Sequence, residues 1–480
     1  MNKAYFIGID IGTQGVRVVL VDERGQQLYV KEEVFLLNNN SREQQSPELW
    51  WQCCERLIPA VLAEAQNSIL LTNIKAVAVT STSGTIIPLG HDYNPLHAAI
   101  MYSDPRSGKE AEFCKEVAAK EVKEGYTAFN SSSGLPKMRW YLAHFHEKAG
   151  EIYKFIHASD FITGRLCGEY GVTDYTNALK SGYNLHQNQW PSYISQDIGI
   201  RKDWLQLVKP SGEPLGTLIP KLAVEWGLSP EVIITTGMTD GCASQVASGA
   251  VCPGQWNTTI GTTMVIKGVT RQEVIDPTGA IYNHRHPAGY WMPGGASNTG
   301  ADWVSRLFAN EDLRKMEEMT AAAIPTEDIA WPLLQQGERF PFFAPQATGF
   351  WPNNGTVETF AACMEGVAFI ERLAYERIIQ LSGEQISAVF TAGGASNSET
   401  WMRIRSSVIN RPVYKMKNVS GAAGAAILAA SRTHYQDLQE AADAMVSPEK
   451  TIMPEEKLVQ RYEEKYQRFI IELKERKFLQ

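Results

Sequence analysis

Two aspartates stand where a carboxylate could do chemistry, and the first is Asp240. It follows the predicted strand 232–237 and precedes the stretch 242–250, whose small residues can form a helix. A carboxylate at a strand-to-helix corner is held rigidly, which suits a general base that takes a proton from an alcohol. Aspartate can also cap the helix there, because it accepts hydrogen bonds from the first free amides. The two roles are compatible, and we predict Asp240 as the base.

The second aspartate, Asp10, lies near the end of the apolar run 5–11. A carboxylate in such a strand is costly unless a magnesium ion or a substrate hydroxyl makes use of it. We therefore predict a metal or substrate site at Asp10.

Two Gly-Thr turns could bind phosphate. Ile11-Gly12-Thr13 and Ile260-Gly261-Thr262 start 249 positions apart, and each lies between two stretches rich in β-forming residues. Glycine lets backbone amides approach an anion, and the threonine hydroxyl adds a donor. Either turn alone would be an ordinary hairpin. Their common context predicts a duplicated unit, whose second copy has Thr259 in place of Asp10.

Length, net charge, cysteine content and hydrophobicity limit the kind of protein that carries these residues. A chain of 480 residues is expected to form about two to three domains. A net charge of -8 without a basic cluster argues against nucleic acid and membrane partners. Seven scattered cysteines show no zinc spacing and fit a reducing cytoplasm. With no apolar stretch of about 18 residues, we expect neither a signal peptide nor a transmembrane helix.

Further motifs follow one another in a fixed order along the chain. They are Tyr102-Ser103-Asp104-Pro105-Arg106, Pro136-Lys137-Met138-Arg139-Trp140, Thr-Asp-Tyr-Thr-Asn-Ala at 173–178, Asp240-Gly241, the turn Gly261-Thr262-Thr263, Glu-Gly-Val-Ala-Phe at 365–369, and Gly393-Gly394-Ala395 ahead of Trp401. Together with Asp10-Ile11-Gly12-Thr13, they make the chain resemble the FGGY carbohydrate kinases, which belong to the actin-like, ribonuclease-H-fold ATPase superfamily. The resemblance covers most of the chain.

This resemblance implies an α/β fold with two actin-like ATPase (ribonuclease-H-like) domains, mixed β-sheets flanked by helices and an interdomain cleft. We expect a sugar-binding domain at 1–248, a nucleotide-binding domain at 249–435 and a helical extension at 436–480. Apolar residues spaced as one helical stripe near the C-terminus predict that a terminal helix docks on the body; they are Leu458, Tyr462, Tyr466 and Phe469.

The resemblance also implies roles for individual residues. Asp240 would deprotonate a substrate hydroxyl, and Asp10 and Asp240 would be the metal-binding residues, with ATP and Mg²⁺ as cofactors. The implied ATP-binding residues are Gly12, Thr13, Gly261, Thr262, Thr263, Gly393, Gly394, Ala395 and Asn397. The implied substrate-binding residues are Asp10, Ser83, Tyr102, Asp104, Arg106 and Asp240.

Two departures from the family pattern stand out. The adenosine loop has Ala392 where a third glycine is common, and Tyr102 stands where tryptophan is common. The turn Ser81–Thr85 lacks both the arginine-glutamate pair of glycerol kinases and the methionine-histidine pair of common xylulokinases. It is more similar to ribulokinase-like or xylulokinase-like members, so a ketopentose such as D-ribulose or D-xylulose is the leading substrate, ahead of aldonates, deoxy-ketoses and tetritols.

Other classes of protein compete with this interpretation. An actin-like or chaperone-like ATPase would share the phosphate hairpins but would not need the 102–106 and 137–140 elements. A dinucleotide-binding oxidoreductase is disfavoured, because 8–15 lacks the Gly-x-Gly-x-x-Gly spacing. The expected partners are a small sugar and ATP, and the sequence leaves open whether the protein is a homodimer.

The alanine- and glycine-rich stretch 421–426 has small residues on every face of a predicted helix. We interpret it as a helix packed closely against a neighbouring helix rather than as a ligand-binding segment.

Overall fold

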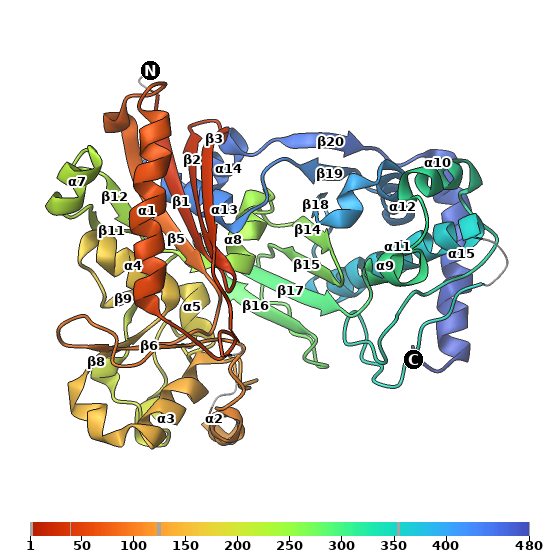
Figure 1. The fold of residues 1–480 in the computed structure, drawn as a ribbon. Coiled ribbons are helices and arrows are strands. Elements are labelled where there is room, and N and C mark those ends of the chain that lie inside the picture. Colours follow the sequence, from red (N-terminus) through yellow and green to blue (C-terminus); the bar gives the residue numbers. More distant parts are fainter. Residues whose placement is uncertain (1–2, 39, 122–125, 353–355, 480) are drawn as a thin grey trace. The chain divides into compact units, whose positions relative to one another are not determined.

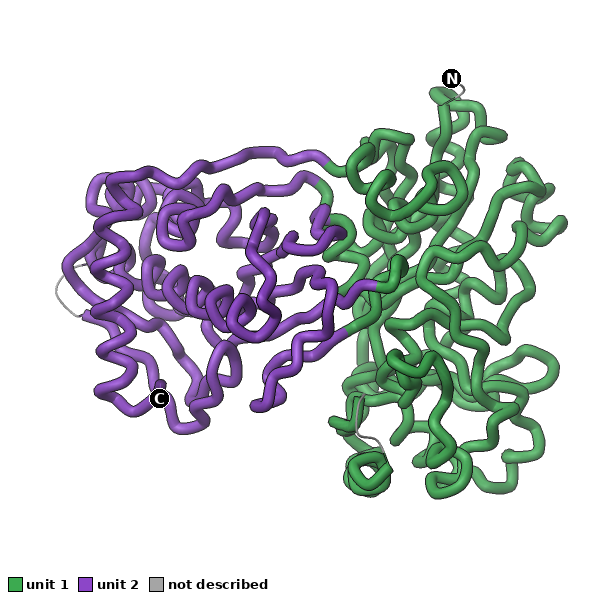
Figure 2. Tube along the Cα trace, turned by 180° about the vertical axis from the view of Figure 1, so that it is seen from behind, with its two compact units in different colours: residues 1–247, 284–289, 418–446 green, residues 248–283, 290–417, 447–480 purple. Residues whose placement is uncertain are grey.

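The computed structural model describes residues 3–38, 40–121, 126–352 and 356–479. They form two compact units. Unit 1 comprises 1–247, 284–289 and 418–446, and unit 2 comprises 248–283, 290–417 and 447–480 (Figure 2). The segment 418–446 thus belongs to unit 1, although it follows most of unit 2 in the sequence. Among the described residues, no helix combines the length and apolar character that crossing a bilayer requires.

Unit 1 is built on a mixed sheet whose strands run in the order β11-β12-β5-β1-β2-β3, with β13 also paired to β5. The strands are β1 (Tyr5–Ile11), β2 (Gly15–Asp22), β3 (Gln27–Val34), β5 (Ile74–Ser81), β11 (Pro214–Thr217), β12 (Ile233–Thr235) and β13 (Met238–Thr239). The predicted hairpin is confirmed: β1 and β2 pair antiparallel through the turn at Gly12 and Thr13. On its other side β1 pairs with β5 in parallel.

Short two-stranded sheets and further helices complete unit 1. The short strands are β4 (Gln44–Gln45) with β7 (Ala99–Ile100), β6 (Ile87–Gly90) with β8 (Ile152–Ile156), and β9 (Val172–Asp174) with β10 (Leu207–Lys209). The helices are α1 (Pro47–Ala65), α2 (Gly108–Glu121), α3 (Gly134–His144), α4 (Ala158–Cys167), α5 (Tyr175–Leu179), α6 (Ser192–Gln196), α7 (Pro220–Trp226), α8 (Asp240–Ala247), α13 (Gly421–Ala430) and α14 (Leu438–Met445).

The two faces of the unit 1 sheet are covered by different helices (Figure 1). Alternate residues of β1, such as Ile7 and Ile9, are fully buried in a core shared with α1 and α4. The residues between them face α13, because a side chain added at Gly8 would collide with the Ala422 carbonyl. Since side chains alternate along a strand, Asp10 lies on the same face as Gly8. The Asp10 carboxylate therefore lies on the face of the sheet that α13 covers.

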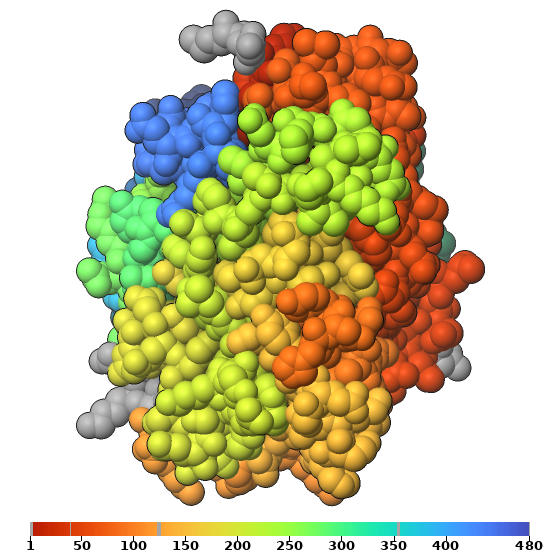
Figure 3. Space-filling model, turned by 90° about the vertical axis from the view of Figure 1, so that its left-hand side faces the viewer, coloured from red at the N-terminus to blue at the C-terminus, as the bar shows by residue number. Residues whose placement is uncertain are grey.

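Helix α13 packs closely against both the sheet and α8, as its small residues predict. A Cβ atom added at Gly424 would overlap the Ala243 carbonyl oxygen of α8. The end of this segment also contacts the edge of unit 1, where the Arg432 guanidinium pairs with the Glu213 carboxylate. In Figure 3, the blue surface of this segment borders yellow-green surface of unit 1. The interpretation of 421–426 as a packing helix is confirmed.

Unit 2 contains a second mixed sheet, in the order β16-β17-β15-β14-β18-β19-β20. Its strands are β14 (Gln255–Ile260), β15 (Met264–Gly268), β16 (Ile281–Arg285), β17 (Trp291–Ser297), β18 (Ala388–Ala392), β19 (Val413–Met416) and β20 (Pro448–Ile452). The last two residues of β16 are assigned to unit 1. Its helices are α9 (Asp302–Leu307), α10 (Leu313–Ala323), α11 (Thr356–Ser382), α12 (Glu399–Ile409) and α15 (Glu456–Glu475). Helix α11 runs through its core, and every residue from Thr359 to Glu371 is buried.

The two sheets repeat one topology. In unit 1 the path β3-β2-β1-β5-β12-β11 changes from antiparallel to parallel pairing at β1 and back at β12. In unit 2 the path β17-β15-β14-β18-β19-β20 has the same pairings in the same order. Each path starts from a hairpin with a Gly-Thr turn. The half-chain repeat predicted from two short turns is therefore confirmed in the fold.

The C-terminal helix α15 docks on unit 2 as predicted, and the four apolar residues of its stripe are all buried. A buried ion pair between Lys465 and Glu365 joins it to α11. Of the predicted extension 436–480, only the part from 447 onward belongs to unit 2, because α14 lies in unit 1.

Candidate functional site

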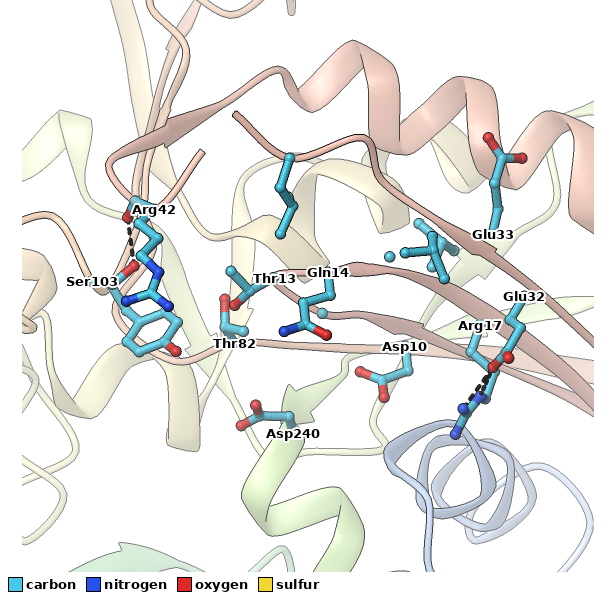
Figure 4. Close-up of a pocket in the computed structure, with 16 residues that line it drawn as sticks. Asp10, Thr13, Gln14, Arg17, Glu32, Glu33, Arg42, Thr82, Ser103 and Asp240 are labelled. Atoms are coloured by element: carbon cyan, nitrogen blue, oxygen red, sulfur yellow. Dashed lines mark hydrogen bonds and ion pairs between the residues drawn. The ribbon is translucent and has the colours of Figure 1, made fainter. Parts of the chain in front are cut away.

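A cavity of about 740 Å³ in unit 1 brings the two predicted carboxylates together. It is lined by the turn after β1, by parts of β2 and β3, and by residues from the ends of β5 and β13. The lining residues are Asp10, Gly12, Thr13, Gln14, Gly15, Val16, Arg17, Glu32, Glu33, Val34, Leu37, Arg42, Thr82, Tyr102, Ser103 and Asp240. Figure 4 shows Asp10 and Asp240 projecting into the same space.

Asp240 is the first residue of α8 and directly follows β13. The Gly241 amide donates a hydrogen bond to Asp240 Oδ1 at 2.6 Å. The carboxylate therefore lies at the positive end of the helix and at the edge of the cavity, so capping and proton transfer are compatible here.

Asp10 carries an unusual proton affinity for a carboxylate. Its Oδ1 atom is buried and accepts no hydrogen bond from any described residue. Burial, followed by the negative charge of Asp240, raises the pKa of Asp10 to about 7, against a smaller opposing effect of Arg17. A carboxylate with a buried, unpartnered oxygen beside a second carboxylate is suited to a cation.

This raised pKa predicts a pH dependence of stability that Asp10→Asn removes. The folded protein binds a proton at Asp10 that the unfolded chain releases near pH 3.8, so the carboxyl favours folding at low pH, and that contribution is lost as the pH rises toward 7. Between pH 4 and 7, the free energy of unfolding of the wild type should fall relative to Asp10→Asn by up to about 1.4 kcal/mol per pH unit. Urea denaturation at several pH values measures the difference, and parallel curves would contradict the prediction.

The turn after β1 is held by one backbone–backbone and one side-chain–backbone hydrogen bond. The Gly12 amide donates to the Gly15 carbonyl at 2.9 Å, and the Gln45 side-chain amide donates to the Thr13 carbonyl at 2.8 Å. Gly12 and Thr13 line the cavity close to Asp10 in sequence, as a phosphate-binding turn requires.

The predicted sugar-binding residues are only partly brought together. Tyr102 lines the cavity and is 37% exposed. Ser83 is not among the lining residues, and its neighbour Thr82 is. The role of Ser83 in substrate binding stays a prediction.

Asp104 and Arg106 form an ion pair rather than part of the cavity wall. Arg106 Nη2 lies 2.6 Å from Asp104 Oδ2, and the Asp104 side chain is 1% exposed. The Arg106 guanidinium also lies over the Trp140 ring, 4.5 Å from its centroid. The Lys137 ammonium donates to the Ser131 carbonyl, and burial lowers its pKa to about 8. The 102–106 and 136–140 elements therefore contact each other through Arg106 and Trp140.

Sequence reasoning missed several charged residues of the cavity. Arg17 and Glu32 face each other across β2 and β3 and form an ion pair of 2.6 Å. Arg42 lines the cavity from the segment before α1, and no described residue pairs with its side chain. These residues carry no motif, and only the cross-strand spacing of the predicted hairpin could have indicated Arg17.

The predicted ATP-binding residues of unit 2 lie at the ends of two parallel strands. The turn Gly261–Thr263 follows β14, and the Gly261 amide donates to the Thr263 carbonyl at 3.0 Å. Gly393 follows β18 and has φ 87°, where a Cβ atom would approach the Ile260 carbonyl to 2.5 Å. Because β14 and β18 are paired in parallel, both turns lie at the same edge of the sheet.

A second cavity, of about 690 Å³, lies beside this edge in unit 2. Three predicted nucleotide residues line it: Gly394, Ala395 and Asn397. The remaining lining residues were not predicted, apart from Trp401 as a family landmark; they are Ala301, Val304, Ser305, Phe308, Ala309, Glu311, Leu313, Glu317, Phe360, Met364, Ser398 and Trp401. An apolar cavity with a few polar groups suits a planar heterocyclic base.

Within the part of the chain that the structure describes, no group of three or more histidine, cysteine, aspartate or glutamate side chains could hold a metal ion alone. Magnesium in phosphoryl-transfer sites needs only one or two carboxylates, since phosphate oxygens and water supply its other ligands. Asp10 and Asp240 meet this requirement.

Comparison with known proteins identifies the family of the chain. The N-terminal domain of the FGGY family of carbohydrate kinases matches residues 5–247, and the C-terminal domain of the same family matches residues 256–432. The chain is 25% identical to the xylulose kinase of Bacillus subtilis (strain 168), over 95% of this chain and 94% of the relative. It is also 25% identical to a gluconokinase of that organism, over 92% of this chain and 90% of the relative.

A solved structure shares the fold. The crystal structure of a "xyloylose kinase" from Brucella ovis superposes with a TM-score of 0.85 at 23% identity, covering 97% of this chain and 98% of the other. The predicted α/β fold of two actin-like domains with mixed, helix-flanked sheets is confirmed.

Proposed function

Because the chain belongs to the FGGY family of carbohydrate kinases and is therefore an ATP-dependent sugar kinase, we propose that it phosphorylates a ketopentose, with D-xylulose as the first candidate. The non-phosphorylating ATPase considered from the sequence is not favoured by this membership. The observation that carries the proposal is the pair Asp10 and Asp240 in one cavity with Thr82 and Tyr102.

In the proposed reaction, Asp240 accepts the proton of the sugar hydroxyl as that oxygen attacks the γ-phosphorus of ATP, and the bond from the γ-phosphorus to the β,γ-bridging oxygen breaks to release ADP. Its position at the start of a helix keeps the carboxylate oriented, and positioning is the main source of catalysis in phosphoryl transfer. The predicted phosphate-binding residues remain Gly12, Thr13, Gly261, Thr262 and Thr263. Gly393, Gly394, Ala395 and Asn397 would contact the adenosine.

Asp10 and Asp240 would hold a magnesium ion, which supplies charge neutralisation for the transferred phosphoryl group. The unpartnered Oδ1 atom of Asp10 is the feature of this chain that supports the assignment. A cation would also favour the ionised form of Asp10, whose pKa is raised in its absence.

The choice of an uncharged sugar follows from the charges near the cavity. Four carboxylates line it, those of Asp10, Glu32, Glu33 and Asp240, against only two guanidinium groups, Arg17 and Arg42. Arg17 is already paired with Glu32. A neutral polyhydroxylated ligand avoids repulsion by Asp10 and Asp240. Full-length similarity to xylulose kinases supports the five-carbon ketose.

A second candidate substrate is an aldonate such as D-gluconate. Arg42 lines the cavity as a cation that no described residue pairs with, and arginine is suited to bind a carboxylate through two hydrogen bonds. Full-length similarity to a gluconokinase points in the same direction.

We expect ADP release by the purified protein to be stimulated most strongly by D-xylulose when D-xylulose, D-ribulose, glycerol and D-gluconate are compared by kcat/KM. A preference for D-gluconate that Arg42→Leu abolishes would replace the ketopentose by the aldonate. Arg24→Leu is the matched control, because Arg24 is a cation of the same unit outside the cavity lining. Equal rates with and without every sugar tested would contradict the proposal.

A further inference from the structure

A buried hydrogen-bond network in unit 1 surrounds Asp174, a residue that the proposed reaction does not use. Its side chain is fully buried. Oδ1 accepts hydrogen bonds from the Thr176 hydroxyl at 2.6 Å and the Ser211 hydroxyl at 3.2 Å. Oδ2 accepts one from the Asn177 side-chain amide at 2.6 Å. The network is therefore built around one carboxylate.

One branch of the network ends beside the proposed base. The Thr176 hydroxyl, which donates to Asp174, accepts a hydrogen bond from the Thr239 amide at 2.8 Å. Thr239 is the last residue of β13 and directly precedes Asp240. A single hydroxyl thus holds the backbone amide of the residue that precedes Asp240.

The other branch ends beside the turn that lines the cavity. The Asn177 amide also donates to the Ser159 hydroxyl at 3.1 Å, and the Ser159 backbone amide donates to the Ser81 hydroxyl at 3.0 Å. Ser81 ends β5 and directly precedes Thr82. The two branches reach paired positions, because Thr239 lies opposite Ser81 in the parallel pair β13–β5.

Helix capping alone does not account for this network. Asp174 does cap α5, accepting from the Thr176 and Asn177 amides. A cap needs only those backbone bonds. The Thr176 hydroxyl instead connects α5 with another element, and its donor and acceptor are both engaged, which leaves it one orientation. Loss of the hydroxyl would leave the Thr239 amide buried without its partner.

We propose that Thr176, oriented by Asp174, is a positioning residue that holds Asp240 in line for proton transfer. The inference rests on the proposed function, in which Asp240 is the base. Thr176 does not line the cavity, so it acts through Thr239 rather than through the substrate.

The test is Thr176→Val, which keeps the shape of the side chain and removes the hydroxyl. We expect kcat to fall about tenfold, the kinetic equivalent of one lost buried hydrogen bond, with the KM for ATP unchanged. Thr176→Ser, which restores the hydroxyl, should restore kcat. Should Thr176→Val fail to fold, Thr176→Ala is measured in the same way.

The matched control is Thr163→Val. Thr163 is also buried in unit 1, but its hydroxyl bonds to no described residue, so the substitution should leave kcat unchanged. An unchanged kcat in Thr176→Val, or a loss that Thr176→Ser does not reverse, would overturn the positioning role. Asp240→Asn in the same assay separates the two claims: full activity there refutes the base itself, whereas an inactive Asp240→Asn with a fully active Thr176→Val refutes only the positioning.

Discussion

Replacing Asp240 with asparagine should lower kcat by a factor of about 10²–10⁴ and leave nucleotide binding largely intact. The amide keeps the size of the side chain at the start of α8 but cannot accept the proton of the sugar hydroxyl. Removing one of two neighbouring carboxylates should also lower the pKa of Asp10, because the charge of Asp240 contributes to raising it. Steady-state kinetics with the best sugar measures the fall in kcat. Calorimetric titration with ATP measures nucleotide binding separately.

Asp197→Asn is the control for this substitution. Asp197 is an exposed aspartate of unit 1 at the end of α6, outside the cavity lining, so its variant should match the wild type in both assays. An Asp240→Asn enzyme that turns over at the wild-type rate would exclude Asp240 as the base. A variant that loses ATP binding together with activity would show that the residue acts on the nucleotide instead.

The second large effect is expected for Gly424→Ala, a residue outside the cavity lining. A Cβ atom at this position would overlap the Ala243 carbonyl oxygen, so α13 and α8 must move apart. Overpacking of this kind typically costs about 1–3 kcal/mol. Since α8 begins with Asp240, we also expect kcat to fall. Urea denaturation and the kinetic assay report these two changes.

Gly108→Ala provides the matched control for this substitution. Gly108 is the first residue of α2, and a Cβ atom added there meets nothing within 4 Å. Its variant should be as stable as the wild type or slightly more so, because alanine restricts the unfolded chain. Equal stability of Gly424→Ala and Gly108→Ala would mean that α13 and α8 tolerate a wider separation than their packing indicates.

Local patterns were sufficient for the elements that carry the site. The apolar run before Asp10, the glycine turns and the stripe of the C-terminal helix are each encoded within a few residues, and β1, β2, β14, β15 and α15 form where these patterns predict. The repeat was visible from two short turns because both halves keep the same hairpin. The order of the family motifs then predicted the fold and the class of reaction.

Contacts between distant segments were outside the reach of such patterns. Helix α13 has small residues all around, so nothing in its sequence indicates which neighbour it packs against, and only the folded chain pairs Gly8 with Ala422 and Gly424 with Ala243. Likewise, no motif indicated that Thr82 lines the cavity, and only the folded chain brings it there.

The same contrast applies to the two carboxylates. The residue types and their flanking elements identified Asp10 and Asp240 from the sequence, since a charge at the end of an apolar strand or at a strand-to-helix corner is a local signal. Their shared cavity, the raised pKa of Asp10 and the link from Asp174 to Thr239 arise from segments more than 60 residues apart in the sequence that pack side by side. The burial of Asp10 and its proximity to Asp240 result from that packing. The sequence identifies the two aspartates, and the tertiary structure brings them into one site.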